Sequence, residues 1–305
     1  YDIGGQGNHI YIVGHFYGTV DFDPGNSIEN RTAARGSDGF VLKLTLNGDF
    51  VWVKQFSGRY SESIRSFSID NKGNLLIAGS FMQAIDLDPG TAKDSLFFNN
   101  YEGAFITKLD ANGNYIWGKG VDCSGFWTVQ SDTAGNIYLA GEFKDTTDFD
   151  PGSGTHTIVG TNPLWNLFIL KLDDQGSFKW VNTYDARVSA DYGSNSYLSV
   201  DDAQNVYVGG FFENTVDFDA GPATVNKSSA GVRDIFSLKL NKDGELVRVQ
   251  TLGSTHHEQI RATLADSIGF VYQFIDFLNS ISSTFMFSFS NYSLNIFISA
   301  NIKNL

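Results

Sequence analysis

The chain has 305 residues, of which 34 are acidic and 21 are basic, so its net charge is −13 at neutral pH. Charged residues make up only 18% and aromatic residues 14%, which is too apolar for a disordered chain. The negative charge argues against nucleic acid or an anionic membrane as the main partner, because phosphates would be repelled.

The single cysteine, Cys123, excludes a disulfide framework within the chain and is typical of a small buried apolar side chain. The chain starts at Tyr1 without an initiator methionine or an apolar leader. We therefore expect a processed piece, with any signal peptide outside it.

An acidic turn occurs four times along the chain, at spacings of 65, 62 and 69 residues. Its copies are Asp21-Phe22-Asp23-Pro24-Gly25, Asp86-Leu87-Asp88-Pro89-Gly90, Asp148-Phe149-Asp150-Pro151-Gly152 and Asp217-Phe218-Asp219-Ala220-Gly221. A Gly-x-Phe pair precedes each turn, and an apolar-Lys-Leu strand follows it. A tryptophan then stands at the same place in the first three copies, as Trp52, Trp117 and Trp180, and Arg248 replaces it in the fourth. Such a period indicates a repeat architecture.

Each repeat predicts four short strands, which in the second copy run roughly over 63–70, 74–81, 103–109 and 114–119. Tight Gly-containing hairpins join the first strand to the second and the third to the fourth. The other two connections are longer. A four-stranded antiparallel sheet of about 65 residues, repeated in tandem, predicts an all-β fold, a β-propeller.

We expect about five blades, the first incomplete and the last degenerate. The repeats fill residues 1–272, with units near 8–70, 71–132, 133–204 and 205–272. Residues 273–305 lose the acidic turn and are expected to form a degenerate last blade or an aberrant tail.

The Gly-x-Phe, Asp-Phe-Asp-Pro-Gly, Lys-Leu-Asp-x-x-Gly and Asp-x-x-Gly-Asn series resembles the bacterial β-propeller repeats called SBBP-type, found in surface or secreted proteins of Bacteroidetes-like bacteria. The resemblance covers about residues 8–272. It implies a β-propeller in a protein that is secreted or on the outer cell surface, with a binding or scaffolding role and no defined catalytic site.

The strand order places the two tight hairpins of a blade at one end and its longer connections at the other. We therefore expect the acidic turns and the variable loops to share one working face, since function usually lies on such loops.

Two interpretations of the acidic turn remain open. The paired aspartates offer hard oxygen ligands, so Ca²⁺ is the candidate ion. The candidate metal ligands are Asp21, Asp23, Asp86, Asp88, Asp148, Asp150, Asp217 and Asp219. Alternatively, Asp-Pro-Gly builds a type II turn in which the aspartate caps its own backbone.

The tryptophans divide into two groups. The three that recur at one repeat position are expected to pack between blades. Trp127 and Trp165 lie outside the repeat, in or beside the variable connections. We predict them as ligand-binding residues, because an exposed indole suits a sugar ring. Plain packing is the alternative, and the residue pattern favours it.

The predicted function is a binding or scaffold module for a protein or carbohydrate ligand. The alternative is a propeller-fold glycan hydrolase or lyase that uses aspartates of the same face. The sequence favours the non-enzymatic role, since four similar turns do not provide the two different environments that an acid and a base require.

Overall fold

The computed structural model describes residues 2–98, 102–161, 165–187 and 198–254. Beyond these it describes the backbone of strands within 257–299. Every regular element among the described residues is a β-strand, and no described helix is long and apolar enough to cross a membrane. The chain is therefore all-β, as predicted.

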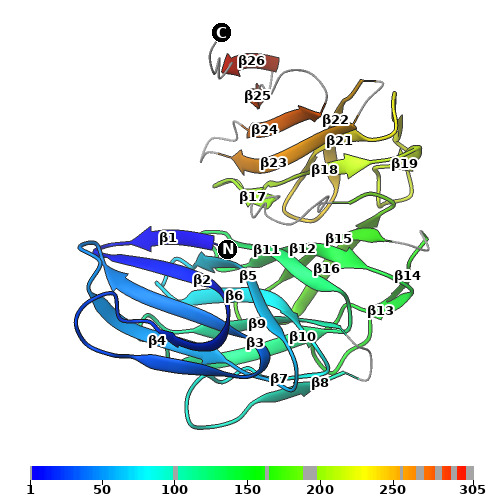
Figure 1. Cartoon of the computed structure of the whole chain (residues 1–305). Helices are drawn as coiled ribbons and strands as arrows, with labels where there is room; N and C mark the ends of the chain where they lie inside the picture. Colours follow the sequence, from blue (N-terminus) through cyan, green and yellow to red (C-terminus); the bar gives the residue numbers. More distant parts are fainter. Residues whose placement is uncertain are drawn as a thin grey trace. The chain divides into compact units, whose positions relative to one another are not determined.

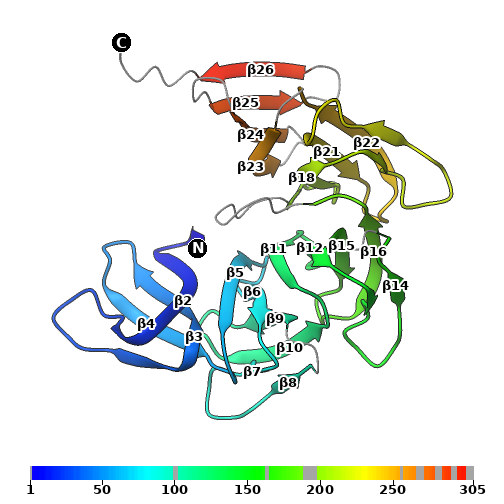
Figure 2. The same ribbon diagram turned by 45° about the vertical axis from the view of Figure 1, so that its right-hand side comes forward.

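The strands form five four-stranded antiparallel sheets, which we call blades one to five (Figures 1 and 2). Blade one is β1 (Asp2–Gln6), β2 (His9–Asp21), β3 (Asn30–Thr45) and β4 (Phe50–Phe56). Blade two is β5 (Glu62–Ile69), β6 (Leu75–Phe81), β9 (Gly103–Leu109) and β10 (Tyr115–Val121). Blade three is β11 (Gly125–Ser131), β12 (Ile137–Phe143), β15 (Asn166–Leu172) and β16 (Phe178–Tyr184). Blade four is β17 (Leu198–Val200), β18 (Val206–Phe212), β21 (Asp234–Leu240) and β22 (Leu246–Leu252). Blade five is β23 (His257–Ala265), β24 (Val271–Leu278), β25 (Thr284–Phe289) and β26 (Leu294–Ser299).

The strands predicted for the second copy agree with blade two. The expectation of an incomplete first blade is wrong, because β1 pairs antiparallel with β2, from Asp2 opposite Val13 to Gln6 opposite His9. Glycines occupy two of the five positions of β1, so the sequence lacks the apolar alternation that marks a strand. The domain boundaries proposed from the sequence stay a prediction.

Three small hairpins were not predicted. They are β7 (Ala84–Asp86) with β8 (Ser95–Phe97), β13 (Thr146–Asp148) with β14 (Thr157–Val159), and β19 (Thr215–Asp217) with β20 (Asn226–Ser228). Each joins the second and third strands of its blade. In blade one the long strands β2 and β3 continue into the same hairpin, where Asp21 lies opposite Asn30. The acidic turn forms the tip of every one of these hairpins.

The chain divides into two compact units. The first comprises Tyr1–Ile137, Thr146–Val159 and Leu172–Phe178, and the second comprises Tyr138–Asp145, Gly160–Lys171 and Lys179–Leu305.

In the first unit, blades one and two share an apolar core. Tyr11, Val13 and Val41 of blade one pack with Ile77 and Phe105 of blade two, and all five are at most 2% exposed. Burial of such a face by the next blade supplies the apolar area that a single four-stranded sheet cannot bury alone.

The repeated lysine and tryptophan join consecutive blades in the same way. The Lys43 Nζ donates to the Ala111 carbonyl of the next blade's tight turn at 2.8 Å. The Trp117 indole N–H likewise donates to the Asp174 carbonyl at 3.2 Å. In the second unit, Lys171 and Trp180 both donate to the Lys242 carbonyl, at 2.8 and 3.2 Å. We call this lysine–tryptophan pair the blade lock; it explains why the two residue types recur at fixed spacing.

A β-bulge at the start of the fourth strand brings the tryptophan into line with the lysine in blades one and two. In blade two the register shifts between Tyr115 and Trp117, so that Trp117 lies opposite Lys108. The residue in the bulge, Ile116, is turned outward and is 46% exposed. Bulges of this kind re-aim a side chain at one point of a strand.

Candidate functional site

The aspartates of the acidic turn bind backbone amides. The Asp86 Oδ1 accepts hydrogen bonds from the amides of Asp88 and Asp94, at 3.3 and 3.0 Å. The Asp88 Oδ1 accepts the amide of Gly90 at 2.7 Å. The same three bonds recur at the other turns, on Asp21 and Asp23, on Asp148 and Asp150, and on Asp217 and Asp219. In all four copies the first aspartate spans eight residues, so these turns have one length and one geometry.

The expected type II turn is not formed. Such a turn needs a positive φ at the glycine, and none of Gly25, Gly90, Gly152 and Gly221 is among the residues with positive φ. The glycine has a steric reason instead. A Cβ on Gly90 would lie 2.9 Å from the Asp88 Oδ1 that caps its amide. Capping by aspartate, the other half of that interpretation, is what the geometry shows.

The acidic turns also lie elsewhere than expected. The acidic-turn hairpin starts at the end of the blade that carries the longer connections. Its tip, however, folds back over its own blade. Figures 1 and 2 both show β7 and β8 beside β10. The carbonyl of Leu87 accepts the Thr107 hydroxyl at 3.2 Å, and the Tyr115 hydroxyl donates to the Asp94 carboxylate. Since Tyr115 directly follows the tight turn, the tip points toward the tight-turn end, and the expectation that acidic turns and variable loops share one face is wrong.

A polar groove of about 480 Å³ in the first unit includes one acidic turn. Asp86 and Asp88 line it together with the basic side chains Arg31 and Lys54. Within the part of the chain that the structure describes, no three or more His, Cys, Asp or Glu side chains are grouped so as to hold a metal ion. Calcium binding at the eight aspartates stays a prediction.

Trp127 lies within a strand, β11, rather than in a variable connection. The Arg65 guanidinium stacks on its ring, with the Cζ atom 4.9 Å from the centroid. The indole nitrogen is buried without a hydrogen-bond partner. Trp127 is half-buried, so its expected ligand role stays a prediction that the described cavities do not support.

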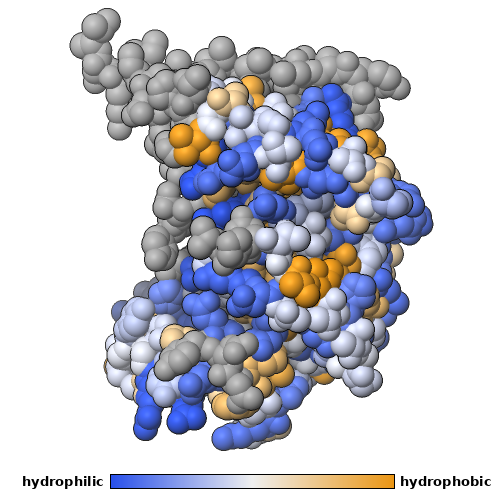
Figure 3. All heavy atoms as spheres, turned by 90° about the vertical axis from the view of Figure 1, so that its right-hand side faces the viewer, coloured by the Kyte–Doolittle hydropathy of each residue, from blue (hydrophilic) through white to orange (hydrophobic). Residues whose placement is uncertain are grey.

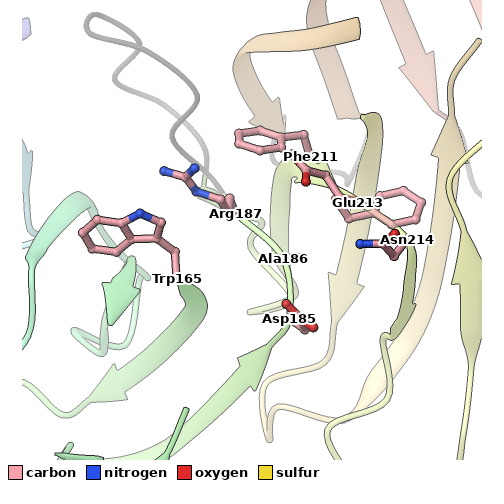
Figure 4. A pocket seen from close by; sticks show the side chains of 8 residues that line it. Trp165, Asp185, Ala186, Arg187, Phe211, Glu213 and Asn214 are labelled. Carbon is pink, nitrogen blue, oxygen red and sulfur yellow. The ribbon is translucent and has the colours of Figure 1, made fainter. Parts of the chain in front are cut away.

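Trp165 lines a cavity of about 110 Å³ in the second unit. It stands directly before β15 and is half-buried. The other residues around the cavity come from two further segments, the connection after β16 and the end of β18: Asp185, Ala186, Arg187, Phe211, Phe212, Glu213 and Asn214. Figure 4 shows the Arg187 side chain reaching toward the Trp165 indole, with Asp185, Glu213 and Asn214 at the other walls.

Arg187 is held in place from several sides. Its Nε lies 3.4 Å from the Oε1 of Glu142, a carboxylate that is only 2% exposed. Its backbone pairs with Phe211, the amide of each residue donating to the carbonyl of the other at 2.9 Å. The guanidinium carbon is 5.7 Å from the Trp165 ring centroid. A hydrogen-bonded ion pair with a buried carboxylate is strong, and it also fixes the orientation of the guanidinium. Arg187 is therefore a fixed hydrogen-bond donor at the cavity rather than a mobile surface charge.

Trp165 is fixed in the same manner. The Lys144 Nζ lies 3.6 Å from its ring centroid, which is a close cation–π contact. The adjacent Asn166 is buried, and its Oδ1 accepts the Thr161 amide at 3.1 Å. The cavity thus combines an indole, a guanidinium, two carboxylates and an amide, all of which can contact a polyhydroxylated ligand.

The sequence indicated Trp165 but not its neighbours. Arg187, Glu213 and Asn214 lie 22 to 49 residues further along the chain. Arg187 lies outside the repeat motifs, and Glu213 and Asn214 follow the Gly210-x-Phe212 pair, which the sequence marks only as part of the repeated strand. Asn214 has φ of 60°, and Gln83 and Asp145 have similar values at the same place of their repeats. This conformation, which asparagine tolerates, therefore belongs to the repeat rather than to the site.

Cys123 is buried, and burial raises the pKa of its thiol to about 12. A thiol of this kind is unreactive at neutral pH, in agreement with the interpretation as a small buried apolar side chain.

No family model matches the chain. An uncharacterised WD repeat-containing protein of Acanthamoeba polyphaga mimivirus is 24% identical over 202 residues, which cover 57% of this chain and 14% of the relative. Among solved structures, a protein of unknown function from Bacteroides caccae aligns over 97% of this chain and 74% of its own, with 8% identity and a TM-score of 0.43. The chain spans a small part of the curated relative, and its likeness to that WD repeat-containing protein is to a repeat protein of the β-propeller type. The narrower resemblance to SBBP-type repeats stays a prediction.

Proposed function

We propose that this protein is a repeat-built binding module whose second unit holds a sugar residue of a glycan in the Trp165 cavity. The fold supports a generic binding or scaffold role, since rigid blades hold variable loops in fixed positions. The observation that carries the proposal is the convergence of Trp165, Arg187, Glu213 and Asn214 on one cavity.

The chemistry of the cavity suits a carbohydrate. Pyranose rings present a flat apolar face, which an indole covers, and a rim of hydroxyl groups, which carboxylates, amides and guanidinium groups bind. A cavity of about 110 Å³ is below the usual size for a drug-like ligand, so it fits one sugar residue at the end or side of a chain.

A glycan array followed by titration calorimetry tests the proposal. A saccharide that binds the wild-type protein should lose at least tenfold in affinity with Trp165→Ala, because the stacking surface is removed. The matched control is Trp127→Ala, which removes the other tryptophan singled out by the sequence. Retained binding in Trp165→Ala, or equal loss in both variants, would refute the assignment.

Two parts of the predicted function rest on less. Location outside the cell follows from the resemblance alone and is checked by fractionating the source cells with an antibody against the chain.

Calcium would have to be bound by the second oxygens of the paired aspartates, because the first oxygens bind amides. A comparison of melting temperatures in Ca²⁺ and in EDTA tests it: a rise in Ca²⁺ supports the ion, and identical values remove it.

A further inference from the structure

The tryptophan of each blade lock lies against a glycine in the tight turn of the following blade. A Cβ built on the turn glycine would lie 3.3 Å from Trp52 at Gly113 and 3.2 Å from Trp117 at Gly176. In the second unit it would lie 3.0 Å from Trp180 at Gly244. The indole of one blade therefore rests on the tight turn of the next, and a Cβ at the turn glycine would crowd it.

Blade one has the same tight turn with nothing resting on it. Gly48 has φ of +88° like its counterparts, but no atom lies within 4 Å of the position of its Cβ. Leu46 occupies the turn position at which, in the other blades, the carbonyls of Ala111, Asp174 and Lys242 accept hydrogen bonds from the blade lock. Leu46 is 59% exposed.

The sheet face above this turn is open as well. Ile12, Phe40 and Leu44 of blade one are only partly buried. Their counterparts in blade two are fully buried, because Tyr11 and Trp52 of blade one cover them; these counterparts are Ile77, Phe105 and Leu109. The acidic-turn hairpin of blade one covers only a part of this open face. There the ring centroids of Phe22 and Phe40 are 4.9 Å apart.

We propose that this surface, the leading face (Ile12, Phe40, Leu44, Leu46 and Gly48), docks one more blade of the same repeat. The partner is a four-stranded antiparallel sheet that carries a lysine in its third strand and a tryptophan in its fourth. Its lysine Nζ and indole N–H donate to the Leu46 carbonyl, and its indole covers Gly48. The interface continues the packing that already joins blades one and two.

The lock residues of this chain do not supply that partner. The pairs of blades two and three donate to the next blade, and in blade one Lys43 does so while Trp52 covers Gly113. In blade four, Arg248 stands opposite Lys239 in place of tryptophan. In blade five the strand register puts Ser288 at the position of the lysine and Asn295 at the position of the tryptophan. A further blade with an intact pair is therefore the occupant that fits.

The test joins a second copy of residues 62–127 directly in front of Asp2, so that an added blade with its own lysine and tryptophan precedes blade one. The probe is Leu46→Cys, labelled with a maleimide. Cys123 is buried, and because the added copy carries a second Cys123, the chain and both fusions without the new cysteine measure the background. The added blade should slow labelling at position 46 at least tenfold. The control fusion carries Lys108→Ala and Trp117→Ala in the added copy only, and should label as fast as the chain without an added blade.

Three results would overturn the proposal. Labelling that stays fast in the fusion shows that the face does not accept a blade. Slow labelling of the monomeric chain without the fusion shows that the chain covers the face itself. Protection that grows with protein concentration shows that a second copy occupies it.

Discussion

At the scale of single residues, the acidic turn allows a direct separation of its two interpretations. Asp86→Asn keeps an oxygen for the amides of Asp88 and Asp94 but removes the charge, whereas Asp86→Ala leaves both amides without a partner. If capping is the role, we expect the alanine variant to lose about 1–3 kcal/mol of unfolding free energy and the asparagine variant much less. Urea unfolding without added metal measures both. Equal losses in the two variants would show that the amides need a charged acceptor, and would contradict capping by any side-chain oxygen.

A buried carboxyl group gives a prediction of pH dependence. Glu62 is fully buried, with no exposed surface. Burial and the neighbouring Asp38 carboxylate raise the pKa of Glu62 from 4.5 to about 8, although the nearby amides of Gly58 and Tyr60 oppose the rise. Asp38 itself is buried and accepts hydrogen bonds from Gln55 and Ser57, both at 2.6 Å.

The sign follows from proton binding. Between pH 4.5 and 8 the folded chain holds a proton on Glu62 that the unfolded chain has lost, so unfolding free energy falls as the pH rises through this window. The loss is on the order of a few kcal/mol. Glu62→Gln should flatten the dependence, as measured by urea unfolding at pH 5 and pH 8, whereas the exposed control Glu102→Gln should not. An unchanged slope in Glu62→Gln would contradict the assignment.

At the scale of elements, the blade lock separates the apolar and polar contributions of a tryptophan. The Trp117 N–H donates to Asp174, while the Trp52 N–H is buried without a partner. Phenylalanine at either place keeps most of the apolar area and removes the N–H. Trp117→Phe should therefore cost about 1 kcal/mol more than Trp52→Phe, which loses no bond. Urea midpoints of the two variants check this, and a larger loss in Trp52→Phe would show that packing alone decides.

The same elements show how far sequence patterns reach. The four strands of blade two were predictable, because apolar residues alternate between two glycine turns. The β7–β8 hairpin was not, because each of its strands has only three residues, too few for a periodic pattern to be recognised in the sequence. The turn type was predicted wrongly, since the need for glycine comes from the Asp88 carboxylate in space and not from a positive φ.

At the scale of the whole molecule, the repeat predicted the architecture but only one residue of the candidate site. Trp165 was found because it breaks the repeat. Arg187 and Asn214 lie far from it in the sequence and meet it only because strands of two blades end near each other. A repeat reveals what all blades share, whereas a site depends on how single blades differ.

The charge of the molecule carries the last prediction. On the described part of the face drawn in Figure 3, hydrophilic side chains are widespread and alternate with apolar patches. With a net charge of −13, the protein should repel the phosphates of DNA and RNA at long range. Electrophoretic mobility shifts should therefore show no complex with duplex or single-stranded DNA or with RNA at 50 mM salt, where such binding is strongest. A cooperative urea transition of the same preparation serves as the control for folding. A complex that forms at low salt and dissociates as salt rises would reveal a basic surface that the net charge conceals, and would make nucleic acid a candidate partner again.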